Sequence, residues 1–372
     1  MPINKTTSVV TAIMMMPFSG VVDAASWQSS VEVPTTVEYD SNPLLLTSKE
    51  KGVTRTIIAP DYTLVGQFDR DQLRMGVGMQ VLRSSDRSVM DDREDPNLSL
   101  GWQRETESGG FGLLAQYDES STLSGAVQDT GVVTTTDGTQ KMSRLTGNWS
   151  SAVTERSTLA NELRYSHATY DISTLTGYDE YANDFTWTYA FSERTDIITG
   201  FEARRYEPDS STTAIATNSY VPSIGLKYQF SDSLVGAMHV GVNQTDGAGT
   251  QRRGEGGASL TYRGSRHEAS FSADRSTMSN AEGGAAEMDM VRGSWSYLLT
   301  ETTRVGADAW WQDSKGQNPN TMQTYSVWAS RAFSPAWDLR FSLLYKERQQ
   351  SGLPNADATI AGLTLTYRYP DI

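Results

Sequence analysis

The sequence predicts an all-β fold, a transmembrane antiparallel up-and-down β-barrel of about 18 strands, with 16 as the nearest alternative count. Compact polar turns recur about every 40 residues, near Arg70, Ser108, Val153, Glu193, Asp232, Ser265, Glu301 and Pro335. Two segments of alternating apolar and polar residues lie between successive turns, joined by a longer polar loop. Mean hydropathy is only -0.46, as expected where every second side chain faces water.

The first segment is predicted to be an export signal, residues 1–24. Lys5 gives it a positive start, Val9 to Val22 is mostly apolar, and Val22-Asp23-Ala24 places small residues at the cleavage positions. Residues 25–372 would then form a single outer-membrane β-barrel domain. A buried N-terminal helix is the alternative interpretation of the same segment.

The strands are expected wherever apolar residues alternate with polar or small ones. Leu73, Met75, Val77, Met79 and Val81 define one apolar face, and Arg74, Gly76, Gly78 and Gln80 lie between them. The same period of two runs through 184–191, 337–346 and 361–369. Because successive side chains of a strand point to opposite faces, this pattern is typical of a sheet with one apolar and one polar side.

The connections differ at the two rims. Turns such as Asp69-Arg70-Asp71 and Ser231-Asp232-Ser233 are compact and are assigned to the periplasm. Ser84 to Pro96, Ser121 to Gln140, Pro208 to Asn218 and Gln349 to Asp357 are longer and are assigned to the outside of the cell. An even strand count needs a first strand before Val53, which Val31 to Asp40 can supply, with Ser41-Asn42-Pro43 opening the first outer loop.

The main rival architecture is a β-propeller, whose blades also repeat about every 40 residues. A blade needs four short strands in each period, whereas this sequence offers two long ones. A barrel of about 18 strands is wide enough to enclose an aqueous lumen.

Composition limits the other classes of function. The formal charge of -14 argues against nucleic-acid binding. Cysteine is absent, so a disulfide framework and a thiolate metal site are excluded. The three histidines are His167, His239 and His267. Ser166 and His167 are adjacent and would face opposite sides of a strand, so they cannot form a nucleophile and base pair, and no cluster of an acid and a base on neighbouring strands is evident. We therefore predict no enzyme activity and no cofactor. The acidic run Asp91-Asp92-Arg93-Glu94-Asp95 is interpreted as a solvated loop, with calcium bridging to lipopolysaccharide as the alternative.

Several segments resemble a known family. Tyr39-Asp40-Ser41-Asn42-Pro43, Ala59-Pro60-Asp61-Tyr62-Thr63-Leu64, and the successive stretches LSLGWQRETESGGFGLLAQYDES and LTGNWSSAVTERSTLANELRYSHATYD are similar to outer-membrane β-barrel proteins of bacterial exopolysaccharide systems, the second β-barrel porin group. The resemblance implies a role in carrying a secreted polysaccharide across the outer membrane of a Gram-negative bacterium. The chain departs from the usual aromatic barrel C-terminus, because Tyr369 is followed by Pro370-Asp371-Ile372.

Alternation assigns a set of charged and aromatic residues to the inward face, with signs that are mixed rather than segregated. Glu162 and Arg164, Glu202 and Arg204, and Asp338 and Arg340 are each two residues apart and could neutralise each other. These residues are interpreted either as wall pairs that keep the lumen hydrated or as a track of weak contacts for sugar hydroxyls. The predicted lumen residues are Arg74, Arg144, Glu162, Arg164, Asp184, Glu202, Arg204, Lys227, Arg263, Arg292, Arg304, Asp308, Trp310, Trp328, Asp338, Arg340 and Arg368.

Trp310 and Trp328 fall on the inward alternation of neighbouring strands, where a sugar ring could stack on an exposed indole. A register error of one residue would instead send both into lipid.

The sequence leads to three hypotheses on function. The first is an outer-membrane channel for exopolysaccharide export, with polysaccharide cargo, lipopolysaccharide, the barrel assembly machinery and a periplasmic polysaccharide-export protein as expected partners. The second is a general diffusion porin for small solutes or oligosaccharides. The third is a structural or adhesive barrel that acts through its outer loops.

Overall fold

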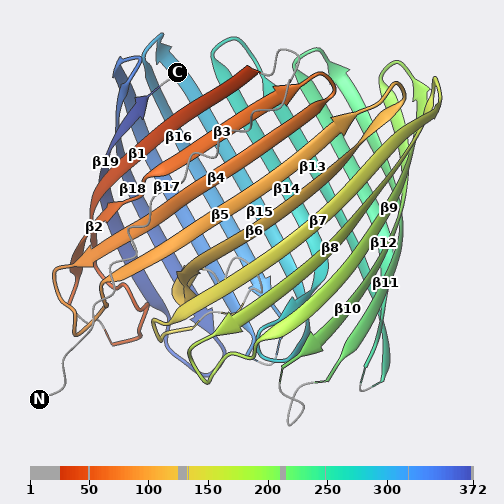
Figure 1. Cartoon of the computed structure of the whole chain (residues 1–372). Helices are drawn as coiled ribbons and strands as arrows, with labels where there is room; N and C mark the ends of the chain where they lie inside the picture. Colours follow the sequence, from red (N-terminus) through yellow and green to blue (C-terminus); the bar gives the residue numbers. More distant parts are fainter. Residues whose placement is uncertain are drawn as a thin grey trace, which may run out of the picture.

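In the computed structural model, a single sheet curls round and closes on itself (Figure 1). The structure describes residues 26–48, 51–124, 132, 134–209, 215–247, 249–316 and 318–369. The predicted signal segment 1–24 lies outside the described residues. Within the described residues, no helix is long and apolar enough to cross a bilayer.

The strands follow one another round the sheet, each antiparallel to the next, and β19 pairs with β1 to close it. Their bounds are β1 Ser26–Asp40, β2 Val53–Ile58, β3 Asp61–Phe68, β4 Asp71–Ser84, β5 Arg93–Glu105, β6 Gly109–Ser121, β7 Thr139–Thr154, β8 Ser157–Tyr170, β9 Tyr178–Ser192, β10 Thr195–Pro208, β11 Thr217–Ser231, β12 Leu234–Asp246, β13 Thr250–Arg263, β14 His267–Asn280, β15 Gly284–Thr300, β16 Thr303–Ser314, β17 Asn320–Ser334, β18 Trp337–Gln350 and β19 Ala356–Tyr369.

β2 and β3 are two halves of one barrel strand. Both lie between β1 and β4, and the pairing register continues across the gap, since Ile58 faces Val81 of β4 and Asp61 faces Gly78. Ala59 and Pro60 separate the halves, and proline has no N–H to donate to a ladder. The carbonyl of Pro60 still accepts the Met79 N–H at 3.1 Å. The barrel therefore has 18 strands, and the expected first strand is confirmed and begins earlier, at Ser26.

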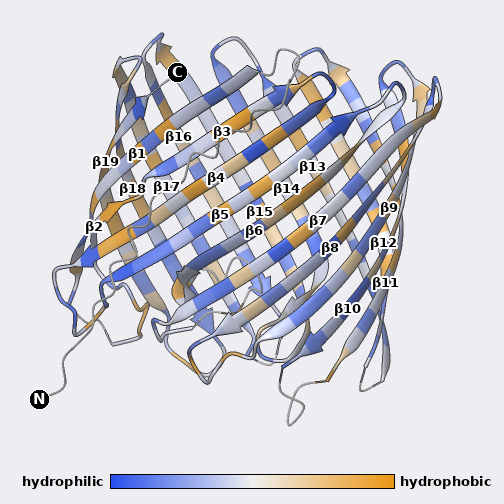
Figure 2. Cartoon of the chain, viewed as in Figure 1, coloured by the Kyte–Doolittle hydropathy of each residue, from blue (hydrophilic) through white to orange (hydrophobic). Residues whose placement is uncertain are grey.

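Hydrophilic and hydrophobic residues succeed one another along individual strands, as the colouring of Figure 2 shows. Because successive side chains of a strand point to opposite faces, this pattern separates an apolar exterior from a polar interior. Large apolar side chains are exposed at every second position, as in Met238, Val240 and Val242 of β12. Exposure of this kind would be costly in water but suits a hydrocarbon surround. The apolar exterior, the closed sheet and the polar lumen together are those of an outer-membrane β-barrel.

The rims agree with the expected turns in all but small details. The turn predicted near Val153 lies two residues later, at 155–156, because a bulge between Ala152 and Thr154 lengthens β7. The loop predicted from Ser84 to Pro96 is shorter, because β5 already begins at Arg93. Pro96 is therefore part of the wall, facing Met79 across the ladder.

The outward assignment makes a direct prediction for stability. Ile224 of β11 is 54% exposed on the outward face, and the adjacent Ser223 points inward. We expect Ile224→Arg to lower the free energy of unfolding in lipid vesicles by about 2–4 kcal/mol, since a cation near the bilayer midplane is costly. Ser223→Arg should change it much less, and equal effects of the two substitutions would contradict the register.

Candidate functional site

The candidate site is the inner wall of the barrel. Each predicted lumen residue points into the barrel. The evidence is that its neighbours along the strand point outward and include the exposed apolar side chains; Leu163, for example, is exposed between Glu162 and Arg164. Trp310 and Trp328 also point inward, so the register is not shifted by the one residue that would have placed both in lipid. Their roles in transport stay a prediction.

The first cluster of the lumen lies on β8, β9 and β10. Arg164 Nη1 is 3.2 Å from Glu162 Oε1, and Arg164 Nη2 is 3.8 Å from Asp184 Oδ2. Arg204 contacts Glu202 and lies 3.9 Å from Glu180. Two of the three ion pairs expected within single strands therefore form, and four carboxylates share two guanidinium groups.

The opposite wall, formed by β15 to β19, has the reverse balance. It has two inward carboxylates, Asp308 and Asp338, and a larger number of inward cations. These cations are Arg292, Arg304, Arg340, Lys346, Arg348 and Arg368. Three of them find carboxylates on the neighbouring strands β14 and β1: Arg304 with Glu268, Lys346 with Asp40 and Arg368 with Glu32. Among the described residues, the other three, Arg292, Arg340 and Arg348, form no ion pair.

Charges are therefore mixed along the chain but sorted between walls, which corrects the sequence-based expectation of unsegregated signs. β9 and β18 are separated by about half the circumference of the closed sheet, so the acidic and basic surfaces face each other across the water. A hydrated ion or dipolar solute between them experiences a field directed across the lumen, and the low-dielectric walls strengthen it.

Trp328 belongs to a preorganised group on the basic wall. Its Nε1 donates to Asp308 Oδ2 at 3.0 Å, and Ser326 Oγ donates to the same oxygen at 3.1 Å. The indole lies against Gly306, where an added Cβ would come within 2.4 Å of it, and the Arg340 guanidinium carbon is 4.3 Å from the ring centroid. The predicted Asp338–Arg340 pair is therefore wrong, because Arg340 stacks on Trp328 instead.

Trp310 lies deeper among apolar neighbours. It packs against a cluster formed by Leu45, Met322, Ala356 and Ala358. Its ring still borders a cavity of about 650 Å³ that Arg292, Asp308 and Lys346 also line. The sequence predicts that a sugar ring could stack on Trp310 and on Trp328. Protein atoms cover part of each indole, which reduces the area left for a sugar ring.

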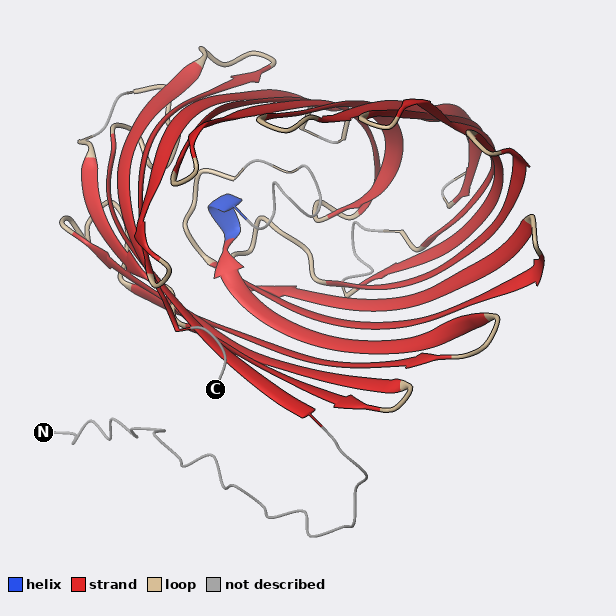
Figure 3. Ribbon diagram, turned by 90° about the horizontal axis from the view of Figure 1, so that it is seen from above, coloured by secondary structure: helices blue, strands red, loops and turns tan. Residues whose placement is uncertain are grey.

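Three segments from the loop rim reach into the barrel, as the view along its axis shows (Figure 3). The first loop turns inward at Leu45, held by Asn42, whose Nδ2 donates to Leu46 O at 2.9 Å and Asp357 O at 3.0 Å. The helical turn at 122–124 places Leu123 beside the cavity under β14 to β18. The third is the tip of the β14–β15 hairpin.

The β14–β15 tip, residues 276–288, leaves the wall and crosses toward β9 and β10. β14 pairs with β13 only as far as Arg275, although β13 continues to Thr250. Beyond that point Thr277 N donates to Glu255 Oε1 at 2.6 Å, Arg204 Nη1 donates to Thr277 O at 3.0 Å, and Ser279 donates to Glu180.

The end of the tip is anchored by the outer loops. Thr176 N donates to Ala281 O at 2.6 Å, and Ala281 is fully buried with Leu175 and Val132. Lys315 Nζ donates to Glu287 Oε1 at 2.6 Å, which raises the pKa of Lys315. The tip therefore narrows the lumen while its ends remain part of the wall.

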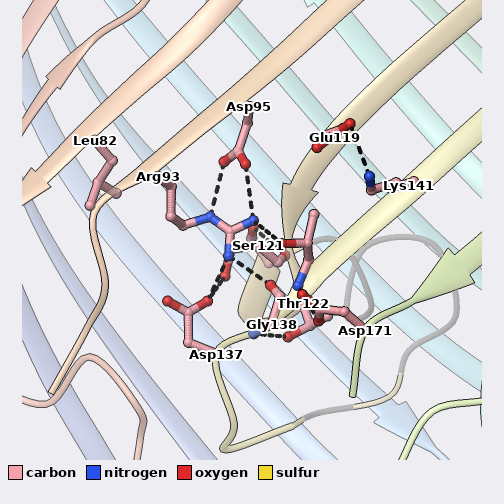
Figure 4. A network of polar contacts seen from close by, with 12 residues as sticks. Leu82, Arg93, Asp95, Glu119, Ser121, Thr122, Asp137, Gly138, Lys141 and Asp171 are labelled. Carbon is pink, nitrogen blue, oxygen red and sulfur yellow. Dashed lines mark hydrogen bonds and ion pairs between the residues drawn. The ribbon is translucent and has the colours of Figure 1, made fainter. Parts of the chain in front are cut away.

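A second anchored region surrounds Arg93 at the base of the loop between β6 and β7 (Figure 4). Arg93 Nε and Nη2 donate to the two oxygens of Asp95 at 3.1 and 3.0 Å, and Nη1 donates to Gly138 O at 2.7 Å and Asp137 Oδ1 at 3.2 Å. Burial raises the pKa of Asp137, although a hydrogen bond from Ser121 and the charge of Arg93 act in the opposite direction. This forked contact fixes where the loop leaves the wall.

The carboxylates of the acidic run Asp91 to Asp95 do not converge on one point where they could bind a metal ion. Asp95 binds Arg93, and Asp92 accepts the Ser84 N–H at 3.0 Å and lies 2.6 Å from Arg87. In the described part of the chain, no group of three His, Asp or Glu side chains is placed to hold a metal ion. His167 faces outward and contacts Asp179 at 3.0 Å, away from the buried Ser166 on the inner face.

Several residues that shape the site are not among those predicted from the sequence. Glu180, Glu255 and Arg93 have inward parity and could have been found by the same alternation rule. Tyr206, which is 1% exposed, and Thr277 could not, because their environment depends on where the β14–β15 tip folds.

Solved structures with a similar fold include two Pseudomonas proteins. Pseudomonas aeruginosa OccK2 (OpdF) in complex with glucuronate matches with a TM-score of 0.53 and 9% identity, covering 93% of this chain and 98% of that one. A BenF-like porin from Pseudomonas fluorescens Pf-5 matches with a TM-score of 0.53 and 10% identity, covering 94% and 100%. Neither a family model nor a curated protein matches the sequence.

The fold and lumen thus define an 18-stranded outer-membrane β-barrel with a polar interior. At such low identity the similarity concerns the fold alone. It supports the outer-membrane β-barrel part of the family resemblance seen in the sequence, and it gives no support to the exopolysaccharide part.

The anchoring of the β14–β15 tip can be tested by single-channel recording in planar bilayers. Ser279→Ala removes a hydrogen bond to the Glu180 carboxylate, a contact worth about 1.5–3 kcal/mol. We expect more frequent excursions to a larger conductance. Ser272→Ala, on the part of β14 that stays in the wall, is the matched control, and identical traces for both variants would argue against a tip held by this contact.

Proposed function

We propose that this chain is a passive outer-membrane diffusion channel for small hydrophilic solutes, including mono- and oligosaccharides. The observation that carries the proposal is the narrowed lumen: the β14–β15 tip crosses to β9 and β10, and Leu45 and Leu123 project inward from other loops. Small solutes can pass such inward segments without displacing them. A polymer must thread them continuously.

The wall chemistry supports the same conclusion. Sorted carboxylates and guanidinium groups, together with hydroxyls such as Ser326 and Thr364, offer many weak polar contacts. Contacts that are numerous and individually weak allow a solute both to enter and to leave. No reaction step is required of these residues.

Exopolysaccharide export, favoured by the sequence resemblance, is the competing proposal, and size selection separates the two. In liposome swelling assays with the purified barrel, we expect mono- and disaccharides to enter quickly and a dextran of polymer size to be retained. Rapid loss of entrapped dextran would favour export. In cells, deletion should impair uptake of small solutes while leaving the amount of secreted polymer unchanged.

The basic wall gives a second measurable property. Arg292 and Arg340 have no ion-pair partner among the described residues, so they should attract small anions into the lumen. Replacing both with Gln should shift the reversal potential in a KCl gradient toward cation selectivity, with a larger shift at low salt because screening is weaker. Arg331→Gln, on the outward face of the adjacent strand β17, is the control. If the control moved selectivity as much as the double variant, the basic wall would not be its source.

A further inference from the structure

Two asparagines lie on the outward face of β8 and β9, in the part of the wall that meets hydrocarbon. Asn161 has the same parity as the exposed Leu163, and Asn183 has the parity of Phe185 and Tyr181. Many outward mid-strand positions elsewhere carry large apolar side chains, as at Val240, Phe271 and Leu343. An amide at this depth is therefore unusual for the barrel.

Aromatic pairs on the same two strands mark the limits of the apolar band. Tyr165 and Tyr181 lie 5.1 Å apart on the loop side of the asparagines, and Trp187 and Tyr189 lie 6.0 Å apart on the turn side. Tyrosine and tryptophan favour the two membrane interfaces. Asn161 and Asn183 lie between these markers and so within the hydrocarbon region.

The two amides satisfy only part of each other's hydrogen-bonding capacity. Asn161 Nδ2 donates to Asn183 Oδ1 at 2.8 Å and to the Asp184 carbonyl at 3.2 Å. Among the described residues, no group bonds to the Oδ1 acceptor of Asn161 or to the Nδ2 donors of Asn183. Lipid chains offer neither partner, and an unsatisfied amide in an apolar medium costs several kcal/mol.

We infer that the outward face of β8 and β9 is a self-association surface occupied by a second copy of this chain. The unused acceptor of Asn161 and the unused donor of Asn183 are complementary to each other. A two-fold axis along the membrane normal would let Asn183 of each copy donate to Asn161 of the partner subunit. Both copies then keep the same orientation in the membrane.

The surrounding surface fits such a contact. Leu163 and Leu145 are 54% and 45% exposed, and Phe185 is 38% exposed, so apolar side chains surround the amide pair. Gly147 is outward on the adjacent strand β7, and the nearest atom to an added Cβ there is 3.9 Å away. The small residue leaves room for close approach of a second surface.

Crosslinking can test the surface directly, because the chain contains no cysteine. Leu163→Cys places one thiol on the proposed face, and Leu363→Cys places one at a comparably exposed outward position on β19. In isolated outer membranes treated with a mild oxidant, we expect a disulfide-linked dimer of the chain from Leu163→Cys and little from Leu363→Cys. Equal crosslinking, or a product containing a different protein, would overturn the inference.

The amides themselves are tested by replacing both with Leu. The variant N161L/N183L should keep the folded, heat-resistant barrel and its single-barrel conductance. Its apparent dimer dissociation constant, measured by light scattering or sedimentation in detergent, should rise about tenfold or more. Thr35→Leu, an outward polar-to-apolar change on β1, is the control. A wild-type chain that stays monomeric, or an unchanged dimer in N161L/N183L, would refute the role of the pair, whatever solute the channel carries.

Discussion

The closure of one sheet on itself is the constraint on which the rest of the structure depends. Hydrocarbon offers no partner to a backbone N–H or C=O, so every spanning residue must be paired with a neighbouring strand. The pairing of β1 with β19, from Val31 with Tyr369 to Asp40 with Ile360, removes the last free edges over most of the wall. Once the sheet is closed, each side chain has only two destinations, lipid or lumen. The polar and charged composition of the chain then becomes the composition of a water-filled interior.

That constraint explains why alternation was a reliable guide to the lumen. A register shift of one residue would place Arg74 or Arg340 in lipid, and the high free-energy cost of a charge in lipid strongly disfavours that register. The need for an even strand number likewise predicted the first strand before Val53. Rim details were less predictable because bulges, such as the one between Ala152 and Thr154, shift a turn by residues that no local pattern marks.

Contacts between distant strands could not be derived in this way. Arg340 had two acceptable neighbours, an acidic residue two positions back on its own strand and an indole on the adjacent one, and the structure shows it over Trp328. Arg204 shows the same limit more strongly. Its carboxylate contact within β10 follows from spacing, whereas its bond to Thr277 O depends on a hairpin 73 positions away folding inward.

In the inward hairpin, hydrogen bonds from side chains replace some of the backbone hydrogen bonds between strands. When β14 leaves β13 beyond Arg275, ladder hydrogen bonds are lost along the loop-side end of β13. Side chains replace part of them: Glu255 accepts the Thr277 N–H and also the Asn243 amide, and Arg204 reaches the Thr277 carbonyl. Charge-assisted bonds of this kind are stronger than neutral ones, so the departure from the wall can be stable. A segment held by a few polar side chains rather than by a continuous ladder can narrow the lumen without adding a strand to the barrel.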